Sequence, residues 1–272
     1  MSVPAIKLTR GIHVMHVLYR IDRAKWNSLP GGESKLTLER LQKLCEANNA
    51  SSNPKLATYV NVGGKADLVF IIYAAEMGQL SAIHRALENS FPVGTLQLVY
   101  SFFSVTELPE YVTTEDDLLR SIQAEGLESG TDAFIQKLEA GKKRQAEYEH
   151  YRLNPELPDW ELMAFYPMSK RRAGNDNWYM LDFEARKKLM AGHARVGRKF
   201  GGRISQLITG ATGLDDYEWG VTLMAHQADA LKEIVYEMRF DEVTARYGEF
   251  GPFYVNMRLQ PAEIWEHLGL IQ

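Results

Sequence analysis

The order of its apolar segments constrains the fold of this chain most strongly, because the same order occurs twice. Each half reads as strand, helix, two strands, helix and strand, judged from apolar runs and from stripes at helical spacing. This order is typical of the ferredoxin-like unit. In the first half the segments are His13–Tyr19, the stripe Leu38, Leu41, Leu44 and Cys45, Leu56–Val62, Leu68–Tyr73, the stripe Leu80, Ile83, His84 and Leu87, and Leu96–Phe102.

The second half repeats that order without clear residue identity to the first. Its segments are Trp160–Tyr166, a helix that Asp182 can cap and that carries Leu189, Met190, His193 and Val196, then Ile204–Thr209, Tyr217–Met224, the stripe Leu231, Ile234, Val235 and Met238, and the alternating run Phe253–Leu259. A sheet with helices on one face must have its other face covered. We therefore predict an α+β fold in which tandem ferredoxin-like (βαββαβ) halves form a dimeric α/β-barrel-type structure; two unrelated α+β domains are the alternative.

We divide the chain into an N-terminal half (1–107), a polar connector (108–158) and a C-terminal half (159–272). The connector carries the acidic run 115–117 and the basic run 142–144, and Ala133, Ile135 and Leu138 indicate a helix within it. It is interpreted as a solvated linker, a lid over a ligand or an oligomer contact.

Composition excludes several classes of protein. Hydrophobic residues make up 45% of the 272 and charged residues 24%, as in globular proteins with a core. A net charge of −4 gives no broad positive field for nucleic acid or an acidic membrane. The single Cys45 excludes an internal disulfide and a cysteine-based zinc site. No apolar segment reaches the ~18 residues of a membrane span, and residues 1–10 lack the pattern of a signal peptide, so a cytoplasmic location is the default expectation.

His193 is the histidine whose surroundings suggest chemistry. Of the seven histidines, none form an HxxxH or HExxH pair, and His13 and His16 lie on opposite faces of a predicted strand. His193 falls on the apolar stripe of its helix, with Gly192 and Gly197 beside it. Such an imidazole can ligate haem iron while its other nitrogen is held by an acceptor; a core histidine with one hydrogen bond is the plainer interpretation.

A second group of candidate residues follows the strand that begins at Trp160. The strand ends at Tyr166, and Lys170, Arg171 and Arg172 come soon after. A phenol can be oxidised to a radical, and the cations suit carboxylates; an exposed basic turn is the alternative. Gln206, on the strand after the His193 helix, offers an uncharged donor and acceptor. Phosphate-binding glycine motifs and the GxSxG motif are absent from the sequence.

Several ordered motifs together resemble the coproheme decarboxylase branch of the chlorite dismutase family. The specific match covers about residues 159–254, and the first half agrees mainly in architecture. The matching segments are Phe165–Arg171, Asn177–Tyr179, Leu189, Met190 and His193, Gln206–Gly210, Gly213–Asp216, Glu218–Gly220, Tyr236–Glu242 and Glu249–Gly251.

The resemblance implies a homopentamer that binds haem or its precursor in the second half. It implies that His193 is the axial ligand of the iron, that Tyr166 becomes a radical and that Lys170 lies near the reacting propionate. Gln206 and Met168 would line the distal pocket, where chlorite dismutases carry an arginine in place of Gln206; Arg152, Lys170 and Thr244 would contact propionates. Glu237 and Glu242 are both candidates for the hydrogen-bond partner of His193.

The implied reaction uses iron coproporphyrin III as both substrate and redox centre. Hydrogen peroxide supplies the oxidising equivalents, and a Tyr166 radical takes a hydrogen atom from the β-carbon of a propionate. Loss of carbon dioxide leaves a vinyl group, and a second round gives haem b. A transient contact with coproporphyrin ferrochelatase is a further expectation. The alternatives are a non-catalytic haem-binding or sensor protein, a chlorite dismutase, and a dimeric α/β-barrel protein that binds no haem.

Overall fold

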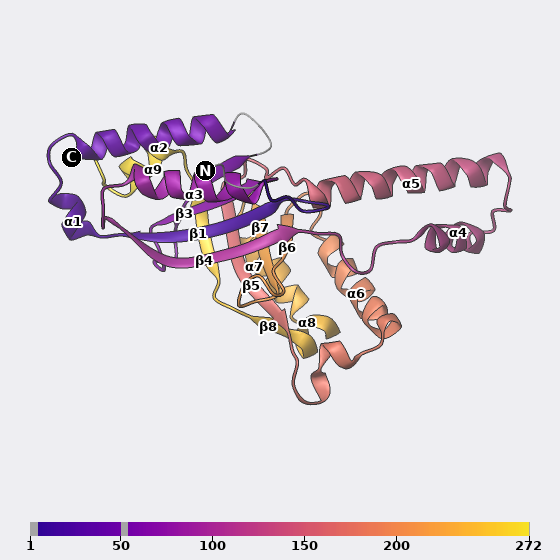
Figure 1. The fold of residues 1–272 in the computed structure, drawn as a ribbon. Helices are drawn as coiled ribbons and strands as arrows, with labels where there is room; N and C mark the ends of the chain where they lie inside the picture. The colour runs from indigo at the N-terminus through magenta and orange to yellow at the C-terminus, as the bar shows by residue number, and fades with distance from the viewer. Residues whose placement is uncertain (1–4, 50–53, 272) are drawn as a thin grey trace.

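The computed structural model describes residues 5–49 and 54–271, and its strands form one antiparallel sheet (Figure 1). The strand order is β7-β6-β4-β1-β3-β2-β9-β5-β8, and additional pairing between β5 and β7 closes the sheet into a barrel. The strands are β1 (His13–Ile21), β2 (Lys55–Asn61), β3 (Leu68–Ala74), β4 (Leu96–Thr106), β5 (Leu162–Lys170), β6 (Ser205–Gly210), β7 (Trp219–Ala225), β8 (Gly248–Phe250) and β9 (Tyr254–Arg258).

The two halves of the barrel share one topology. The first contributes the strand order β4-β1-β3-β2 and the second β9-β5-β7-β6, so the fourth, first, third and second long strands of each half are neighbours. This is the ferredoxin-like arrangement, and the predicted fold class is confirmed. The helices are α1 (Arg23–Asn27), α2 (Glu33–Asn49), α3 (Met77–Ser90), α4 (Glu115–Ala124), α5 (Asp132–Leu153), α6 (Phe183–Arg198), α7 (Ala228–Met238), α8 (Glu242–Tyr247) and α9 (Pro261–His267).

Alternating side chains of the strands fill the barrel interior and the two outer faces. The interior contains aromatic rings such as Phe102 and Phe165, both fully buried. The outer face of the N-terminal half is covered by α2, α3 and α9. The ring centroid of Trp265 in α9 lies 5.8 Å from that of Trp26 in α1. His16 faces the interior and stacks on Phe165 at 4.1 Å, whereas His13 lies on the outer face, as the sequence predicted.

The halves join along two short seams. At one seam β4 pairs with β6 through Val105 opposite Gly210 and Thr106 opposite Thr209. At the other seam Tyr59, Val60 and Asn61 of β2 pair with β9. The two halves are therefore joined by short strand pairings, whereas the strands within each half pair over most of their length.

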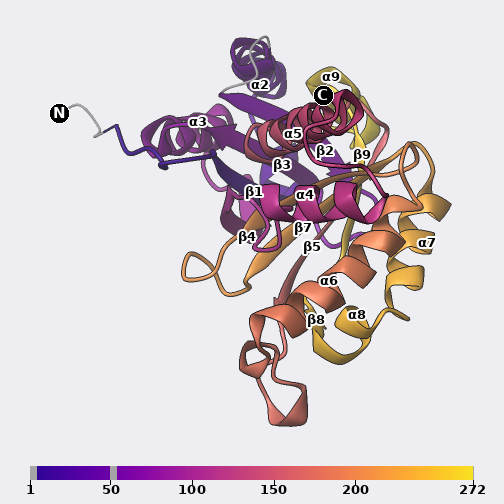
Figure 2. The same ribbon diagram turned by 90° about the vertical axis from the view of Figure 1, so that its right-hand side faces the viewer.

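The connector consists largely of the helices α4 and α5, and α5 projects away from the barrel (Figure 1). Figure 2 shows α5 nearly end-on, with α4 and α6 below it. The Lys187 ammonium of α6 lies 3.1 Å from both carboxylate oxygens of Asp117 in α4, so α4 is tied to α6 by an ion pair. Within the described ranges, every helix is too short or too polar to cross a membrane.

Candidate functional site

The candidate site residues that lie on strands of the second half share one face of the sheet. On β5 alternation turns Tyr166, Met168 and Lys170 to the same side. Tyr166 lies opposite Val221 of β7, which in turn lies opposite Ile208 of β6. Gln206 is two residues from Ile208, so it shares this face, which α7 also covers. The register therefore gathers Tyr166, Met168, Lys170 and Gln206 on one surface.

Tyr166 is buried among aromatic rings. Its side chain is 4% exposed and stacks on Phe253, with the ring centroids 4.4 Å apart; Phe250 lies at 5.7 Å. Burial raises the pKa of the Tyr166 hydroxyl well above its ordinary value, and the nearby Arg239 guanidinium offsets this only in part. Tyr166 is thus held as a neutral phenol with no tendency to ionise, the form from which a hydrogen atom can be lost.

Lys170 is a buried cation at the end of the same strand. It is 8% exposed, and its ammonium lies 4.8 Å above the ring of Trp178. Burial lowers the pKa of Lys170 to about 8, against the opposing attraction of Asp241 and Glu218. A lysine with such a pKa can both hold a carboxylate and transfer a proton near neutral pH.

His193 is presented by α6, whose first turn is capped by Asp182 at 2.7 Å from the Ala185 amide. Its Nδ1 lies 3.0 Å from Oδ2 of Asp241, while Nε2 has no hydrogen-bond partner in the described parts of the chain. The partner of His193 is therefore Asp241, and neither glutamate that the sequence suggested. Glu237 instead pairs with Lys199 at 3.0 Å, and Glu242 pairs with Arg246 at 2.8 Å.

Asp241 is fixed from three directions. It is the N-cap of α8, accepting the Thr244 amide at 2.9 Å on Oδ1 and the Thr244 hydroxyl at 3.1 Å on Oδ2. Burial alone would raise the pKa of Asp241, but the hydrogen bonds from His193 and Thr244 outweigh it, and the pKa is lowered. An ionised Asp241 makes Nδ1 of His193 the protonated nitrogen and leaves the Nε2 lone pair free for a metal.

Thr244 is buried, and the hydrogen of its hydroxyl is used by Asp241. A propionate beside it would need another donor, because a hydroxyl has one hydrogen to give.

The surroundings of His193 fit a flat iron porphyrin. None of the residues of α6 is fully buried, so its apolar stripe is only half covered by the chain itself. A Cβ added at Gly192 would meet open space, and one at Gly197 would touch only flexible side-chain ends. An unpartnered imidazole nitrogen, a half-covered apolar stripe and buried or half-buried cations match what a haem-type group with carboxylates requires.

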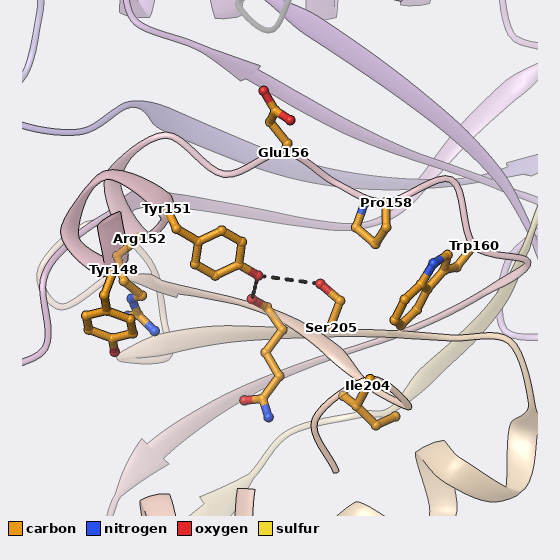
Figure 3. A pocket seen from close by; sticks show the side chains of 10 residues that line it. Tyr148, Tyr151, Arg152, Glu156, Pro158, Trp160, Ile204 and Ser205 are labelled. Atoms are coloured by element: carbon orange, nitrogen blue, oxygen red, sulfur yellow. Dashed lines mark hydrogen bonds between the residues drawn. The ribbon is translucent and has the colours of Figure 1, made fainter. Parts of the chain in front are cut away.

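A cavity of about 470 Å³ adjoins this surface where α5 ends against β6 (Figure 3). Of the predicted site residues, Arg152 and Gln206 line it, and Tyr166, Met168, Lys170, His193 and Thr244 do not. Nη2 of Arg152 lies 3.4 Å from the Glu107 carbonyl and 3.5 Å from the Ile208 carbonyl, while its buried Nε has no partner in the described residues.

The side chain of Gln206 points towards α6. Its Nε2 would lie 3.7 Å from a Cβ added at Gly197, one turn beyond His193. Gln206 and His193 therefore come from the two walls, strand and helix, that would enclose a ligand.

Two further residues belong to this site although sequence reasoning did not assign them to it. Trp178 supplies the ring beneath Lys170. Asp241 has one local signal in the sequence: aspartate is a preferred helix N-cap residue, and Asp241 directly precedes α8.

The chain is similar in sequence and fold to several known proteins. The sequence model of the family described as "Chlorite dismutase" matches residues 35–259. A protein from Thermus thermophilus, described as a novel haem-binding protein, is 36% identical over 98% of both chains, with a TM-score of 0.79. A variant of chlorite dismutase from Candidatus Nitrospira defluvii is 18% identical over 97% of both chains, with a TM-score of 0.71, and shares the fold. The chain belongs to the chlorite dismutase family.

Proposed function

We propose that the protein is a coproheme decarboxylase, which converts two propionates of iron coproporphyrin III to vinyl groups with hydrogen peroxide and yields haem b. The observation that carries the proposal is the placing of Tyr166 and Lys170 on the face of β5 that is shared with Gln206. An oxidisable phenol and a buried cation on the same face of one strand suit the oxidation of a carboxylic acid better than ligand storage alone.

The haem-binding description of the Thermus thermophilus relative supports a porphyrin ligand for this chain. His193, oriented by Asp241, would hold the iron through Nε2. Arg152 and Lys170 would pair with substrate carboxylates. The iron porphyrin supplies redox chemistry towards peroxide, while the protein supplies orientation and charge.

Tyr166 would act on the propionate directly. Its phenol gives up one electron and one proton, and the resulting radical takes a hydrogen atom from the β-carbon of the side chain. A second electron leaves as the bond to the carboxylate breaks, which forms the vinyl group and carbon dioxide. For each propionate, one hydrogen peroxide and one proton are consumed and two waters are formed.

Lys170 would hold the reacting carboxylate and supply the proton that the reaction consumes. A pKa of about 8 leaves the ammonium mostly protonated at pH 7 yet able to give up its proton. Gln206 carries no charge. The resemblance places arginine at this position in chlorite dismutases, and a neutral amide offers less to a chlorite anion, which favours the decarboxylase.

The test is to load the purified protein with iron coproporphyrin III, titrate in hydrogen peroxide and follow the porphyrin mass. Two successive losses of carbon dioxide that end at haem b are expected. Binding without mass loss would contradict the proposal and favour a haem carrier or sensor, with chlorite as the next substrate to assay.

The role of Tyr166 needs a matched control. Tyr166→Phe should bind the porphyrin normally but lose decarboxylation. Tyr254→Phe, which alters a tyrosine on the neighbouring strand β9 whose ring belongs to the barrel interior, should keep it. Haem b formation by Tyr166→Phe at the normal rate would exclude the radical role.

A further inference from the structure

On the side of β6 that faces β4, residues 205–208 have no strand partner among the described residues. β4 ends at Thr106, which lies opposite Thr209, so residues 205–208 of β6 extend beyond it. The Ala211 amide donates to the Glu218 carbonyl, and ladder bonds in antiparallel pairs alternate. The carbonyls of Gln206 and Ile208 therefore point away from β7, towards this open edge.

The last turns of α5 cover that edge in place of a strand. The Tyr151 hydroxyl donates to the Gln206 carbonyl at 3.1 Å and lies 3.4 Å from the Ser205 hydroxyl (Figure 3). The next residue, Arg152, reaches the Ile208 carbonyl. Two consecutive residues of the connector thus satisfy two alternate carbonyls, which would otherwise be exposed beside the cavity.

We infer that Tyr151 is a positioning residue, which fixes the backbone of β6 at Gln206 and so sets where the Gln206 amide lies opposite His193. The role given to Gln206 rests on the proposed function; the restraint on β6 does not. Tyr151 is 42% exposed, too exposed for core packing to explain it, and its hydroxyl ends on the one residue of β6 whose side chain reaches towards α6 at Gly197.

Tyr148 provides a matched control. It lies one turn earlier on α5, lines the same cavity and is 45% exposed, but its hydroxyl makes no hydrogen bond to any described residue. Tyr151→Phe removes a hydroxyl that donates a hydrogen bond to β6, whereas Tyr148→Phe removes a hydroxyl without a hydrogen-bond partner among the described residues. Differences between the two variants thus isolate the hydrogen bond from changes in the hydrophobicity of the cavity.

The first experiment uses the protein without porphyrin. Amide hydrogen exchange in a peptide covering 204–209 should be about fivefold faster in Tyr151→Phe, the scale of one net hydrogen bond, and unchanged in Tyr148→Phe. Equal exchange in both variants would overturn the inference, whatever the protein does with porphyrins.

The second experiment uses the protein loaded with iron coproporphyrin and fluoride as the probe, because a donor on the distal side stabilises iron-bound fluoride. Tyr151→Phe should weaken fluoride binding about fivefold, and it should have no further effect in a Gln206→Leu background. Additive losses, or an unchanged fluoride affinity, would show that Tyr151 does not act through Gln206.

These measurements separate the inference from the proposed function. Fluoride binding requires a bound iron porphyrin but no turnover, so a loaded protein that never releases carbon dioxide still tests Tyr151. If no porphyrin binds, the proposed function fails, and the exchange experiment alone decides whether Tyr151 holds β6.

Discussion

Replacing Lys170 by methionine should stabilise the protein without porphyrin at neutral pH. Lys170 is buried at the end of β5, so its ammonium is largely desolvated and contacts the ring of Trp178. A methionine of similar length keeps the packing and removes the buried charge. The free energy lost by burying that charge would then be the cost of keeping a cation in the candidate site.

The magnitude follows from the pKa of about 8, compared with the ordinary 10.5. Each tenfold change in proton affinity is worth about 1.4 kcal/mol, so the charged form costs about 3 kcal/mol at pH 7. Loss of the contact with Trp178 returns about 1 kcal/mol, which leaves a net gain of about 2 kcal/mol. Because the folded pKa is lowered, the unfolded chain holds the proton more tightly between pH 8 and 10.5, and wild-type stability rises across that window.

Urea unfolding of the wild type and Lys170→Met at pH 7 and pH 9.5 measures this effect. The advantage of the variant should shrink by about 2 kcal/mol between the two pH values. Lys232→Met is the control, because the ammonium of the exposed Lys232 also lies over an aromatic ring, that of Tyr236 at 4.9 Å. A Lys170→Met protein that is less stable at pH 7, or whose advantage is the same at both pH values, would refute the reasoning.

Substitutions at three other positions test the packing around the site and in the barrel interior. Asp241→Ala removes the α8 cap and the hydrogen bond to His193, and thermal unfolding should show a loss of about 1–2 kcal/mol together with weaker porphyrin binding in a spectroscopic titration. Thr244→Val should lose about 1 kcal/mol in denaturant unfolding while Thr244→Ser stays near wild type, since the hydroxyl is the part of the side chain that donates to Asp241; equal losses would point to packing instead. Gly220→Ala would place a Cβ 2.7 Å from Phe102, and calorimetry should show a loss of about 1–3 kcal/mol unless the ring can move.

The fold could be predicted where residues alternate or recur at helical spacing. The helix that contains His193 was found by its apolar stripe. The strand that contains Tyr166 was found as an apolar run, because both of its faces are buried. Most of α5 could not be found, because in its 22 residues only Phe134 and Gly141 are buried, and an exposed helix leaves no apolar stripe. The hydrogen bonds from α5 to β6 depend on where β4 ends beside β6, and this depends on the tertiary structure rather than on any local pattern.

The sequence indicated individual residues of the candidate site more readily than the contacts between them. His193 stands out by its place on a stripe, but its partner depends on how α7 turns into α8. Glu237 and Glu242, which lie in the segment 236–242 of the family resemblance, were the candidate partners, and both pair with cations at the surface instead. Asp241 reaches the ring because the chain turns there, and a side chain in such a turn has no periodic signal.

The two seams that close the barrel have a consequence for the newly made chain. Tyr59 of β2 pairs with Arg258 of β9, so one seam forms only when almost the whole sequence is available. Until then the first half exposes an inner face that includes Val14, Val69 and Phe102. Contacts between such distant residues form slowly, and uncovered apolar sheets aggregate. During synthesis there is therefore an interval in which chaperones have an apolar surface to bind, and the time taken to translate the connector and the second half as far as β9 sets how long that interval lasts.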